Sequence, residues 1–334
     1  MSNDKTYYSL DRLLSYGAMF NIAVGARGLG KTYACKKRAI KRALEAGEEF
    51  VYLRRFQTEL KHSGTFFNDI RHEFPSHELR VNGRRAEARP KGSNDKDAWQ
   101  TIGYFLALTA GATLKSVSYP NVHTLIFDEF IIEEGTRHYL PAEVDTFLDL
   151  YSTIDRNNDR VKVFMLSNAV RCVNPYFIEW RIQTGKPFQK RGGGYLVCEL
   201  IDNEAFAGEV SQTRFGRFIK ETSPEYASYA IDNLFSDDTE DLLGRKPPEA
   251  RLVATLRTRT GEVSLWHHDL MWYVQRRLPR DCNVRLAYKV RARDGERVQT
   301  KGEGYMAILV HAIKDGRVKF DSIESRETIW SVLL

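Results

Sequence analysis

Apolar and polar positions in the first 200 residues follow two periods, and each period predicts one kind of element. Short apolar runs typical of buried strands lie at residues 19–24, 50–53, 122–127 and 161–166. Patterns typical of helices lie at residues 9–16, 31–47 and 142–154. Strand, helix and strand in succession predict a parallel α/β sheet, because a helical crossover returns the chain to the same edge of the sheet.

Four further segments are predicted with different patterns. The pair Asn82-Gly83 lies between short alternating segments and predicts a hairpin with a type I′ turn. We also expect strands at residues 99–108 and 195–200, and one helix at residues 203–220. The regular alternation of strand and helix weakens after about residue 170, so the predicted parallel sheet belongs to the first part of the chain.

The clearest change of composition lies near residue 244. An acidic stretch at 237–241 is followed by Gly244, two basic residues and the pair Pro247-Pro248. Beyond Arg251, alternating segments and short turns predict a mainly β region with one helix at 268–277. A chain of 334 residues is long for one domain. We therefore expect a main domain at 1–200, a small helical linker at 201–245 and a C-terminal domain at 246–334.

The stretch GARGLGKT at residues 25–32 lies between the first predicted strand and the helix that starts near Lys31. Glycines in such a loop let backbone N–H groups surround an anion, and the helix N-terminus adds partial positive charge. Lys31 would reach the β- and γ-phosphates of a nucleotide, and the Thr32 hydroxyl would be a ligand of Mg²⁺. Arg27 is a candidate for contact with the γ-phosphate or with a neighbouring subunit. The predicted binding residues are Gly25, Ala26, Arg27, Gly28, Leu29, Gly30, Lys31 and Thr32.

A second motif follows the buried strand at 122–127. Asp128 is placed at the end of that strand to hold Mg²⁺, and Glu129 to act as general base on the attacking water. A tandem Asp-Glu is typical of ATPases with an additional strand between the two motifs, for which 99–108 is a candidate. Asn168 ends the next predicted strand and is a candidate sensor of the γ-phosphate or the catalytic water.

Composition limits the remaining classes. No apolar run approaches the roughly 20 residues that span a bilayer, and the N-terminus has no apolar core of a signal peptide. The four cysteines (Cys35, Cys172, Cys198 and Cys282) form no metal-binding spacing, which favours reduced thiols. From Gly244 onward there are 18 basic and 11 acidic residues, while the rest of the chain is nearly neutral. A basic C-terminal region indicates contact with a polyanion, nucleic acid first.

These motifs together resemble the phi29-type phage DNA packaging ATPases, compact relatives of the large terminases. The resemblance lies in GARGLGKT at 25–32, LIFDEF at 125–130, STIDRNNDR at 152–160 and MLSNAV at 165–170. It implies an additional-strand P-loop ATPase domain followed by a small C-terminal domain. It also implies a ring of five subunits at the portal vertex that moves double-stranded DNA into a procapsid, in the host cytoplasm and with a possible scaffold RNA.

The resemblance also implies roles for two basic residues. Arg156 follows a helix that is expected to run beside the predicted site, and an arginine there could reach the γ-phosphate of a neighbouring subunit. Its separation from Glu129 is the one that the family uses for a trans-acting arginine finger. Lys115 similarly stands where the family has a second trans-acting basic residue. By resemblance, Lys31 and Thr32 hold Mg-ATP, Asp128 holds the metal and Glu129 the water.

The C-terminal region departs from the full-size terminases. Their nuclease domain has an RNase H-like fold with metal-binding carboxylates on its first strand. The corresponding segment here, residues 251–258, carries no Asp or Glu. We therefore expect a vestigial nuclease fold of α+β type that binds DNA or RNA without cutting it. The run His267-His268-Asp269 offers possible metal ligands, although a structural role for the histidines is the simpler interpretation.

A packaging motor must grip phosphates without reading sequence. Candidates for this grip are Arg84, Arg85, Arg89 and Lys91 of the predicted hairpin, and Arg291 and Arg293 of the C-terminal region. The alternative is a helicase or replication ATPase that acts on single-stranded DNA, which would need aromatic side chains along a basic groove. A third class, the assembly proteins that export filamentous phage, would need a membrane segment.

Overall fold

The computed structural model describes residues 7–93, 98–114, 117–132, 139–140, 142–168, 174–183, 186–223, 227, 243–300, 304–314 and 317–333. Lys115, a predicted trans-acting residue, lies outside them. The chain forms two compact units, one from Met1–Arg171 and Ile182–Ser236, the other from Cys172–Arg181 and Asp237–Leu334. Both units are mixed α/β structures with mainly parallel sheets.

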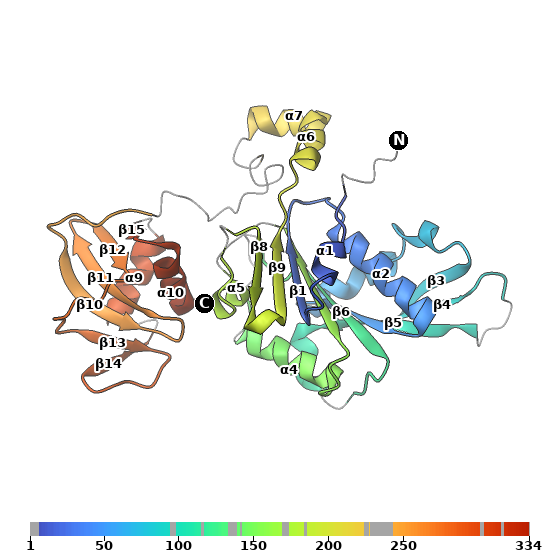
Figure 1. The fold of residues 1–334 in the computed structure, drawn as a ribbon, viewed down its shortest axis with the longest axis horizontal. Helices are drawn as coiled ribbons and strands as arrows, with labels where there is room; N and C mark the ends of the chain where they lie inside the picture. Colours follow the sequence, from blue (N-terminus) through green and yellow to red (C-terminus); the bar gives the residue numbers. More distant parts are fainter. Residues whose placement is uncertain are drawn as a thin grey trace. The chain divides into compact units, whose positions relative to one another are not determined.

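In the part of the first unit that the structure describes, nine strands form one sheet in the order β3-β4-β5-β2-β6-β7-β1-β9-β8 (Figure 1). Neighbours from β5 to β9 run parallel, and the pairs β3–β4, β4–β5 and β8–β9 run antiparallel. The strands are β1 (Phe20–Val24), β2 (Glu49–Arg54), β3 (His77–Asn82), β4 (Arg85–Pro90), β5 (Gln100–Ala107), β6 (Val122–Asp128), β7 (Lys162–Ser167), β8 (Phe188–Arg191) and β9 (Leu196–Leu200).

Strand β7 lies between β1, which precedes the glycine-rich loop, and β6, which ends in Asp128. The expected strand at 99–108 exists as β5, but it pairs with β2 and β4 on the far side of β6. The prediction that this segment separates the two motifs was therefore wrong. Sequence order does not determine strand order in a sheet with helical crossovers, and the intervening strand is the one at 162–167.

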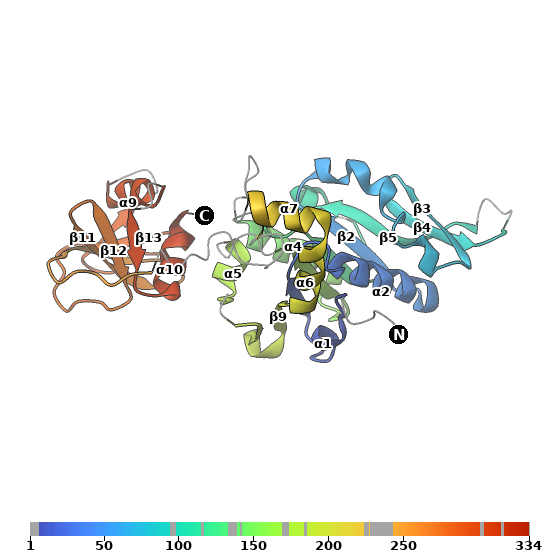
Figure 2. The same cartoon turned by 90° about the horizontal axis from the view of Figure 1, so that it is seen from above.

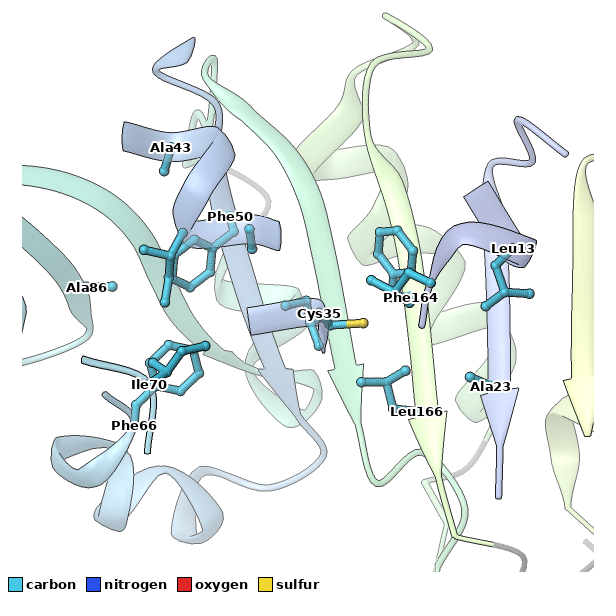
Figure 3. Close-up of a cluster of buried hydrophobic side chains, with 14 of the residues drawn as sticks. Leu13, Ala23, Cys35, Ala43, Phe50, Phe66, Ile70, Ala86, Phe164 and Leu166 are labelled. Atoms are coloured by element: carbon cyan, nitrogen blue, oxygen red, sulfur yellow. The ribbon is translucent and has the colours of Figure 1, made fainter. Parts of the chain in front are cut away.

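Helices and irregular turns cover both faces of this sheet (Figures 1 and 2). On β7, alternate side chains face opposite ways, and Phe164 and Leu166 pack with Cys35 of α2 in one core (Figure 3). On the other face, Phe147 of α4 stacks on Phe127, with ring centroids 5.5 Å apart. The elements of this unit are α1 (Asp11–Leu14), α2 (Lys31–Ala46), η1 (Gln57–Thr65), η2 (Arg71–Glu73), η4 (Leu108–Ala110), α3 (Gly111–Leu114), α4 (Glu143–Asp155), η5 (Gly192–Gly194), α6 (Glu204–Gln212) and α7 (Arg214–Thr222).

Two local predictions need correction. The hairpin of β3 and β4 pairs Asn82 with Arg85, so its loop is Gly83-Arg84, with a positive φ of 59° at Gly83 and none at Asn82. The predicted type I′ turn on Asn82-Gly83 was therefore wrong: the loop begins one residue later, and Arg84 lacks the positive φ that a type I′ turn requires. The predicted helix at 203–220 is two helices, because the Thr213 side chain caps α7 by accepting a hydrogen bond from Gly216 N at 2.9 Å.

The second unit has, among its described residues, a six-stranded sheet in the order β14-β13-β10-β11-β12-β15. The predicted helix at 268–277 was wrong, since β11 and β12 form an antiparallel hairpin there. Helices α9 and α10 pack with the sheet in one apolar core (Figure 2). The elements are α5 (Pro175–Glu179), β10 (Arg251–Arg257), β11 (Glu262–His268), β12 (Met271–Gln275), β13 (Arg285–Tyr288), β14 (Glu296–Gln299), α9 (Gly304–Lys314), β15 (Val318–Phe320) and α10 (Ile323–Leu333).

Candidate nucleotide site

The glycine-rich loop connects β1 to the N-terminus of α2, the arrangement that the sequence predicts. Gly28 and Gly30 have φ values of 83° and 90°, which L side chains rarely adopt. Gly30 is the residue before the first turn of α2, a helix of 16 residues. Unpaired backbone N–H groups of that turn and the helix dipole favour an anion at this place.

The chain that follows β9 packs against this loop. A Cβ atom at Gly25 would lie only 2.9 Å from Cβ of Ile201, so a side chain there would displace the backbone. A Cβ atom at Gly28 would lie 3.6 Å from Cζ of Phe206 in α6. Ile201, directly after β9, and Phe206 of α6 therefore form one wall of the loop.

Lys31 is buried within the loop, with 6% of its surface exposed. Its Nζ donates hydrogen bonds to the carbonyl oxygens of Gly25 and Ala26, each at 2.8 Å. Burial lowers the pKa of Lys31 to about 8, although the nearby Asp128 carboxylate favours the charged form. A phosphate group in the loop would compete with the two carbonyl oxygens for the ammonium group.

The two motifs meet at Asp128. Thr32 Oγ1 donates to Asp128 Oδ1 at 3.0 Å, and the Tyr52 hydroxyl donates to Asp128 Oδ2 at 2.7 Å. The carboxylate is almost fully buried. Hydroxyl and carboxylate oxygens are the ligands that Mg²⁺ prefers, and Thr32 and Asp128 place two of them beside the loop. The residues present therefore fit a bound magnesium ion.

Glu129 lies just beyond β6 in a left-handed backbone conformation, with φ of 56°. Its side chain is 57% exposed and forms an ion pair with Arg54. Arg54 Nη2 also lies 3.4 Å from Glu59 Oε1, and its Nη1 lies 3.9 Å from Asp128 Oδ2. Arg54 therefore sits among three carboxylates and sets the direction in which Glu129 points.

Arg55 fixes the backbone of the same turn from the opposite face of β2. Its guanidinium is 3% exposed and pairs with the fully buried Glu143 carboxylate, with Nη2 to Oε1 at 2.8 Å. Arg55 also donates to the carbonyl oxygens of Glu129 and Phe130. Glu143 is the first residue of α4. The start of α4 is therefore bonded, through Arg55, to the turn that carries Glu129.

Asn168 follows the last residue of β7 at the same edge of the sheet. Gly25 N, the first amide of the glycine-rich loop, donates to the carbonyl oxygen of Ser167 at 3.2 Å. Asn168 is thus adjacent in sequence to a residue that contacts the loop. A role in sensing the γ-phosphate remains a prediction.

Arg156 does not lie near the loop of its own chain. It caps the C-terminal end of α4, whose 13 residues span about 20 Å, while the other end of α4 is bonded to the Glu129 turn. Its Nη2 donates to the carbonyl oxygen of Val117, which precedes β6. Arg156 therefore lies near the start of β6, whereas the two motifs follow the carboxyl ends of β1 and β6.

The turn that carries Arg156 is built by two side chains. Asp155 accepts hydrogen bonds from the backbone N–H groups of residues 158, 159, 160 and 161, at 2.9 to 3.0 Å. Burial raises the pKa of Asp155, but these four bonds outweigh it and hold the pKa below its usual value. Arg160 donates to the carbonyl oxygens of Tyr119, Val122 and Ile154. An exposed turn with positive φ at Arg156, Asn157 and Asp159 is thereby ordered.

The residues predicted to grip DNA phosphates differ in their exposure and in whether a carboxylate already pairs with them. Arg84 and Arg85 are exposed on the β3–β4 hairpin, and Arg84 donates to Gln57 Oε1 at 3.1 Å. Arg89 is instead paired with Glu78 at 2.6 Å and lies over the Trp99 ring. Lys91 and Arg291 are exposed, whereas Arg293 pairs with Glu262 at 2.8 Å.

Sequence reasoning assigned no role to Tyr52, Arg54 or Arg55. A signal was present, because these residues end a strand predicted to be parallel to the one that ends in Asp128. The carboxyl ends of parallel strands meet at one edge of the sheet. The sequence alone did not indicate that β2 and β6 are direct neighbours in the sheet.

The remaining candidates from the sequence are the run His267-His268-Asp269 and the cysteines. In the described part of the chain, no three His, Cys, Asp or Glu side chains are grouped as metal ligands would be. His267 packs edge-on against Trp272, and His268 Nε2 lies 3.4 Å from Asp269 Oδ2. Cys35 and Cys198 are buried free thiols whose pKa values are raised by burial. No described helix has the length and apolarity needed to cross a bilayer.

Residues 2–333 match a family described as the Podovirus DNA encapsidation protein (Gp16). The chain belongs to this family. The match covers both structural units, and it confirms the resemblance inferred from residues 25–32 and 125–130.

Relatives of the encapsidation family agree with this assignment. The "DNA packaging protein" of Bacillus phage B103 is 33% identical over 317 residues, which are 93% of this chain and 95% of that protein. "The bacteriophage Phi-29 viral genome packaging motor assembly" is 31% identical with a TM-score of 0.71, over 98% of this chain and 99% of that one. The N-terminal domain of "the DNA packaging ATPase from bacteriophage phi29" is 39% identical with a TM-score of 0.53, over 60% and 98%.

The encapsidation protein is therefore a phage DNA packaging ATPase, as the sequence predicted, rather than the single-strand helicase considered as the alternative. Its first unit carries the ATPase site, and a separate C-terminal unit follows.

If the buried Lys31 contacts the phosphates as predicted, ATP binding should depend on pH. With its pKa at about 8, we expect affinity for ATP to be constant from pH 7 to near 8 and then to fall by about tenfold per pH unit. The sign follows because only the protonated amine attracts phosphate. Titration of a fluorescent ATP analogue from pH 7 to 9.5 measures this. Lys31→Arg, which does not titrate in this range, should bind with a flat profile, and a flat profile for the wild type would contradict the assignment.

Proposed function

We propose that this packaging ATPase works as a homo-oligomeric ring at the portal vertex of a procapsid and drives double-stranded DNA inward. The hydrolysis of Mg-ATP would take place at interfaces between subunits. The observation that carries the proposal is the position of Arg156, at the far end of α4 from the loop of its own chain. Relatives described as a packaging protein and as part of a packaging motor support the ring and its partners. A ring of five is inherited from the family resemblance.

Within one subunit, each residue of the site would have a separate role. The loop amides and Lys31 bind the phosphates, and Thr32 and Asp128 hold the magnesium ion. That ion, when bound, neutralises charge on the β- and γ-phosphates. Glu129 accepts a proton from the attacking water once its carboxylate turns from Arg54 toward the γ-phosphate. Asn168 orients that water or the γ-phosphate. Each role fits the contacts described above.

The transition state needs a further positive charge near the γ-phosphate. Arg27 is exposed within the loop, and Arg156 is held in an ordered turn on the opposite edge of the sheet. In a ring, one subunit's opposite edge can face the next subunit's loop, which would bring Arg156 to the γ-phosphate in trans. Lys115, for which the family resemblance implies a similar role, stays a prediction.

Mixing variants tests whether Arg156 acts in trans. Arg156→Ala alone and Glu129→Gln alone should each abolish DNA-stimulated hydrolysis, because every site lacks one component. Mixed rings should recover part of the activity, since some interfaces pair an intact Glu129 with an intact Arg156. Steady-state hydrolysis at varying ratios of the two variants measures this recovery.

A matched control for the mixture is Arg156→Ala combined with Glu129→Gln in one chain, mixed with wild type. Here both defects travel together, so activity should fall with the fraction of variant and show no recovery. Absence of recovery in the complementing mixture, with rings shown to form, would mean that Arg156 does not act across an interface.

We further propose that the ring grips phosphates through exposed residues such as Arg84, Arg85 and Lys91, without reading sequence. Arg89 and Arg293 are weaker candidates because each already has a carboxylate partner. The ATPase rate should respond to duplex more than to single-stranded DNA and should fall with salt.

We also propose three domains along the chain: an additional-strand ATPase domain at 1–200, a small linker at 201–245 and a vestigial RNase H-like domain at 246–334. The last of these domains would bind nucleic acid. Support for the last comes from strand order, since β12-β11-β10-β13-β14 contains an antiparallel meander followed by two parallel strands. Strand β10, which comes first of these five along the chain, contains no Asp or Glu. That composition supports DNA or RNA binding without cleavage.

A further inference from the structure

The Tyr52 hydroxyl donates a hydrogen bond to the Asp128 carboxylate, the group that would hold the magnesium ion. Tyr52 is on β2, and its backbone pairs with Ile126 of β6, two residues before Asp128. In a strand, residues two apart face the same way. Tyr52 and Asp128 are therefore on one face of neighbouring strands, and the long tyrosine side chain spans the offset between them.

The tyrosine ring is held on several sides. It lies edge-on against Phe66, with centroids 5.0 Å apart, and against Phe105, at 6.0 Å. The hydroxyl of this packed ring donates to Asp128 Oδ2 at 2.7 Å. Tyr52 is partly buried, and a phenylalanine would make the same ring contacts without the hydroxyl's hydrogen bond. Packing alone therefore does not explain a tyrosine at this position.

The two oxygens of Asp128 have different partners. Oδ1 accepts from Thr32 at 3.0 Å, on the side of the phosphate loop, and Oδ2 accepts from Tyr52 at 2.7 Å, on the side away from it. A carboxylate held at one oxygen cannot rotate freely about its last side-chain bond. The Tyr52 contact thereby keeps the other oxygen directed at Thr32 and the loop.

We propose that Tyr52 is a positioning residue for the magnesium site, which holds the Asp128 carboxylate in the orientation that binds the metal. The inference rests on the proposed role of Asp128. Groups that orient a metal ligand commonly change metal affinity by about 10- to 100-fold when they are removed. Tyr52 is expected to act on magnesium affinity and to leave contacts with the nucleotide itself unchanged.

The test compares nucleotide binding with and without metal in the full chain. A fluorescent ADP analogue is titrated in EDTA and then at increasing magnesium concentration, for the wild type and for Tyr52→Phe. Affinity in EDTA should be the same for both. The magnesium concentration that gives half of the metal-dependent gain in affinity should rise by about tenfold in the variant.

Two controls make the outcome specific. Tyr104→Phe removes a hydroxyl that is bonded to Glu49 on the same sheet, away from the site, and should leave the magnesium dependence unchanged. Asp128→Asn should abolish most of the metal-dependent gain. If Tyr52→Phe matches the wild type while Asp128→Asn loses the gain, the positioning role is wrong and the metal site stands.

If Asp128→Asn also keeps the full gain, the assignment of Asp128 to the metal fails, and the role of Tyr52 fails with it. Direct titration of Mn²⁺ by electron paramagnetic resonance in the presence of ADP gives a second readout that does not depend on turnover. A tenfold weaker Mn²⁺ affinity in Tyr52→Phe, with an unchanged melting temperature, supports the proposal. An equal Mn²⁺ affinity overturns it.

Discussion

Glu129→Gln is expected to bind ATP with near wild-type affinity and to hydrolyse it about 10² to 10⁴ times more slowly. Glutamine keeps the size of the side chain and a hydrogen bond to Arg54, but it cannot accept a proton from water. The exposed position of Glu129 leaves room for this change without loss of packing. Single-turnover hydrolysis and titration with a fluorescent ATP analogue measure the two properties separately.

Glu59→Gln is the matched control, because Glu59 also pairs with Arg54 but lies on η1, away from the reacting atoms. It should alter the rate far less than Glu129→Gln does. A near-normal rate in Glu129→Gln would remove Glu129 as the base. An equal loss in both variants would mean that the charge around Arg54, rather than proton transfer, limits hydrolysis.

Arg55→Ala is expected to destabilise the ATPase unit by about 3–5 kcal/mol, because it leaves the Glu143 carboxylate buried without its partner. In a unit of this size each kcal/mol lowers the melting temperature by about 2–4 °C. The substitution also frees the backbone of the Glu129 turn. Thermal unfolding followed by calorimetry would separate the transition of this unit from that of the C-terminal unit.

Two comparisons define the source of the loss. Lys41→Ala breaks an exposed pair with Glu45, at 3.8 Å, and should change stability by less than about 1 kcal/mol. The double variant Arg55→Met with Glu143→Leu replaces both buried charges and should recover much of the loss. A single variant as stable as the wild type would show that the buried pair contributes nothing. An unrecovered double variant would assign the loss to packing or to the bonds from Arg55 to the carbonyl oxygens of Glu129 and Phe130.

Local periodicity predicted most individual elements of the ATPase unit. Strands β1, β6 and β7 and helices α2 and α4 lie within a few residues of the expected segments, because each is a run of buried or one-sided apolar residues. Their arrangement was harder to predict. The position of β7 between β1 and β6 follows from crossovers that involve residues far apart in sequence.

In the C-terminal unit, local pattern was a weaker guide. The segment 268–277 carries apolar residues at Leu270, Met271 and Trp272, which fit a short helix as well as a strand. In the structure this segment forms a strand, because the chain turns tightly at Asp269, with φ of 52°, and then pairs with β11. Tertiary pairing of this kind overrides local propensity.

The candidate site was predictable where a motif specifies chemistry. The contact between Thr32 and Asp128 links the two motifs that the sequence predicts to share a metal. Tyr52, Arg54 and Arg55 lie outside any motif, and only the pairing of β2 with β6 reveals their contacts with Asp128 and the Glu129 turn. Side-chain partners across neighbouring strands depend on register, which spacing along one chain does not supply.

The turn around Arg156 has a consequence for assembly. Asp155 and Arg160 fix its backbone within a single subunit, through bonds to residues 119, 122, 154 and 158–161. Ordering a flexible segment costs about 1–2 kcal/mol per residue. For this turn that entropy is lost when the subunit folds, so it does not oppose association. In the proposed ring, a small contact between subunits could then suffice to hold Arg156 in place, and could still separate readily when the ring changes conformation.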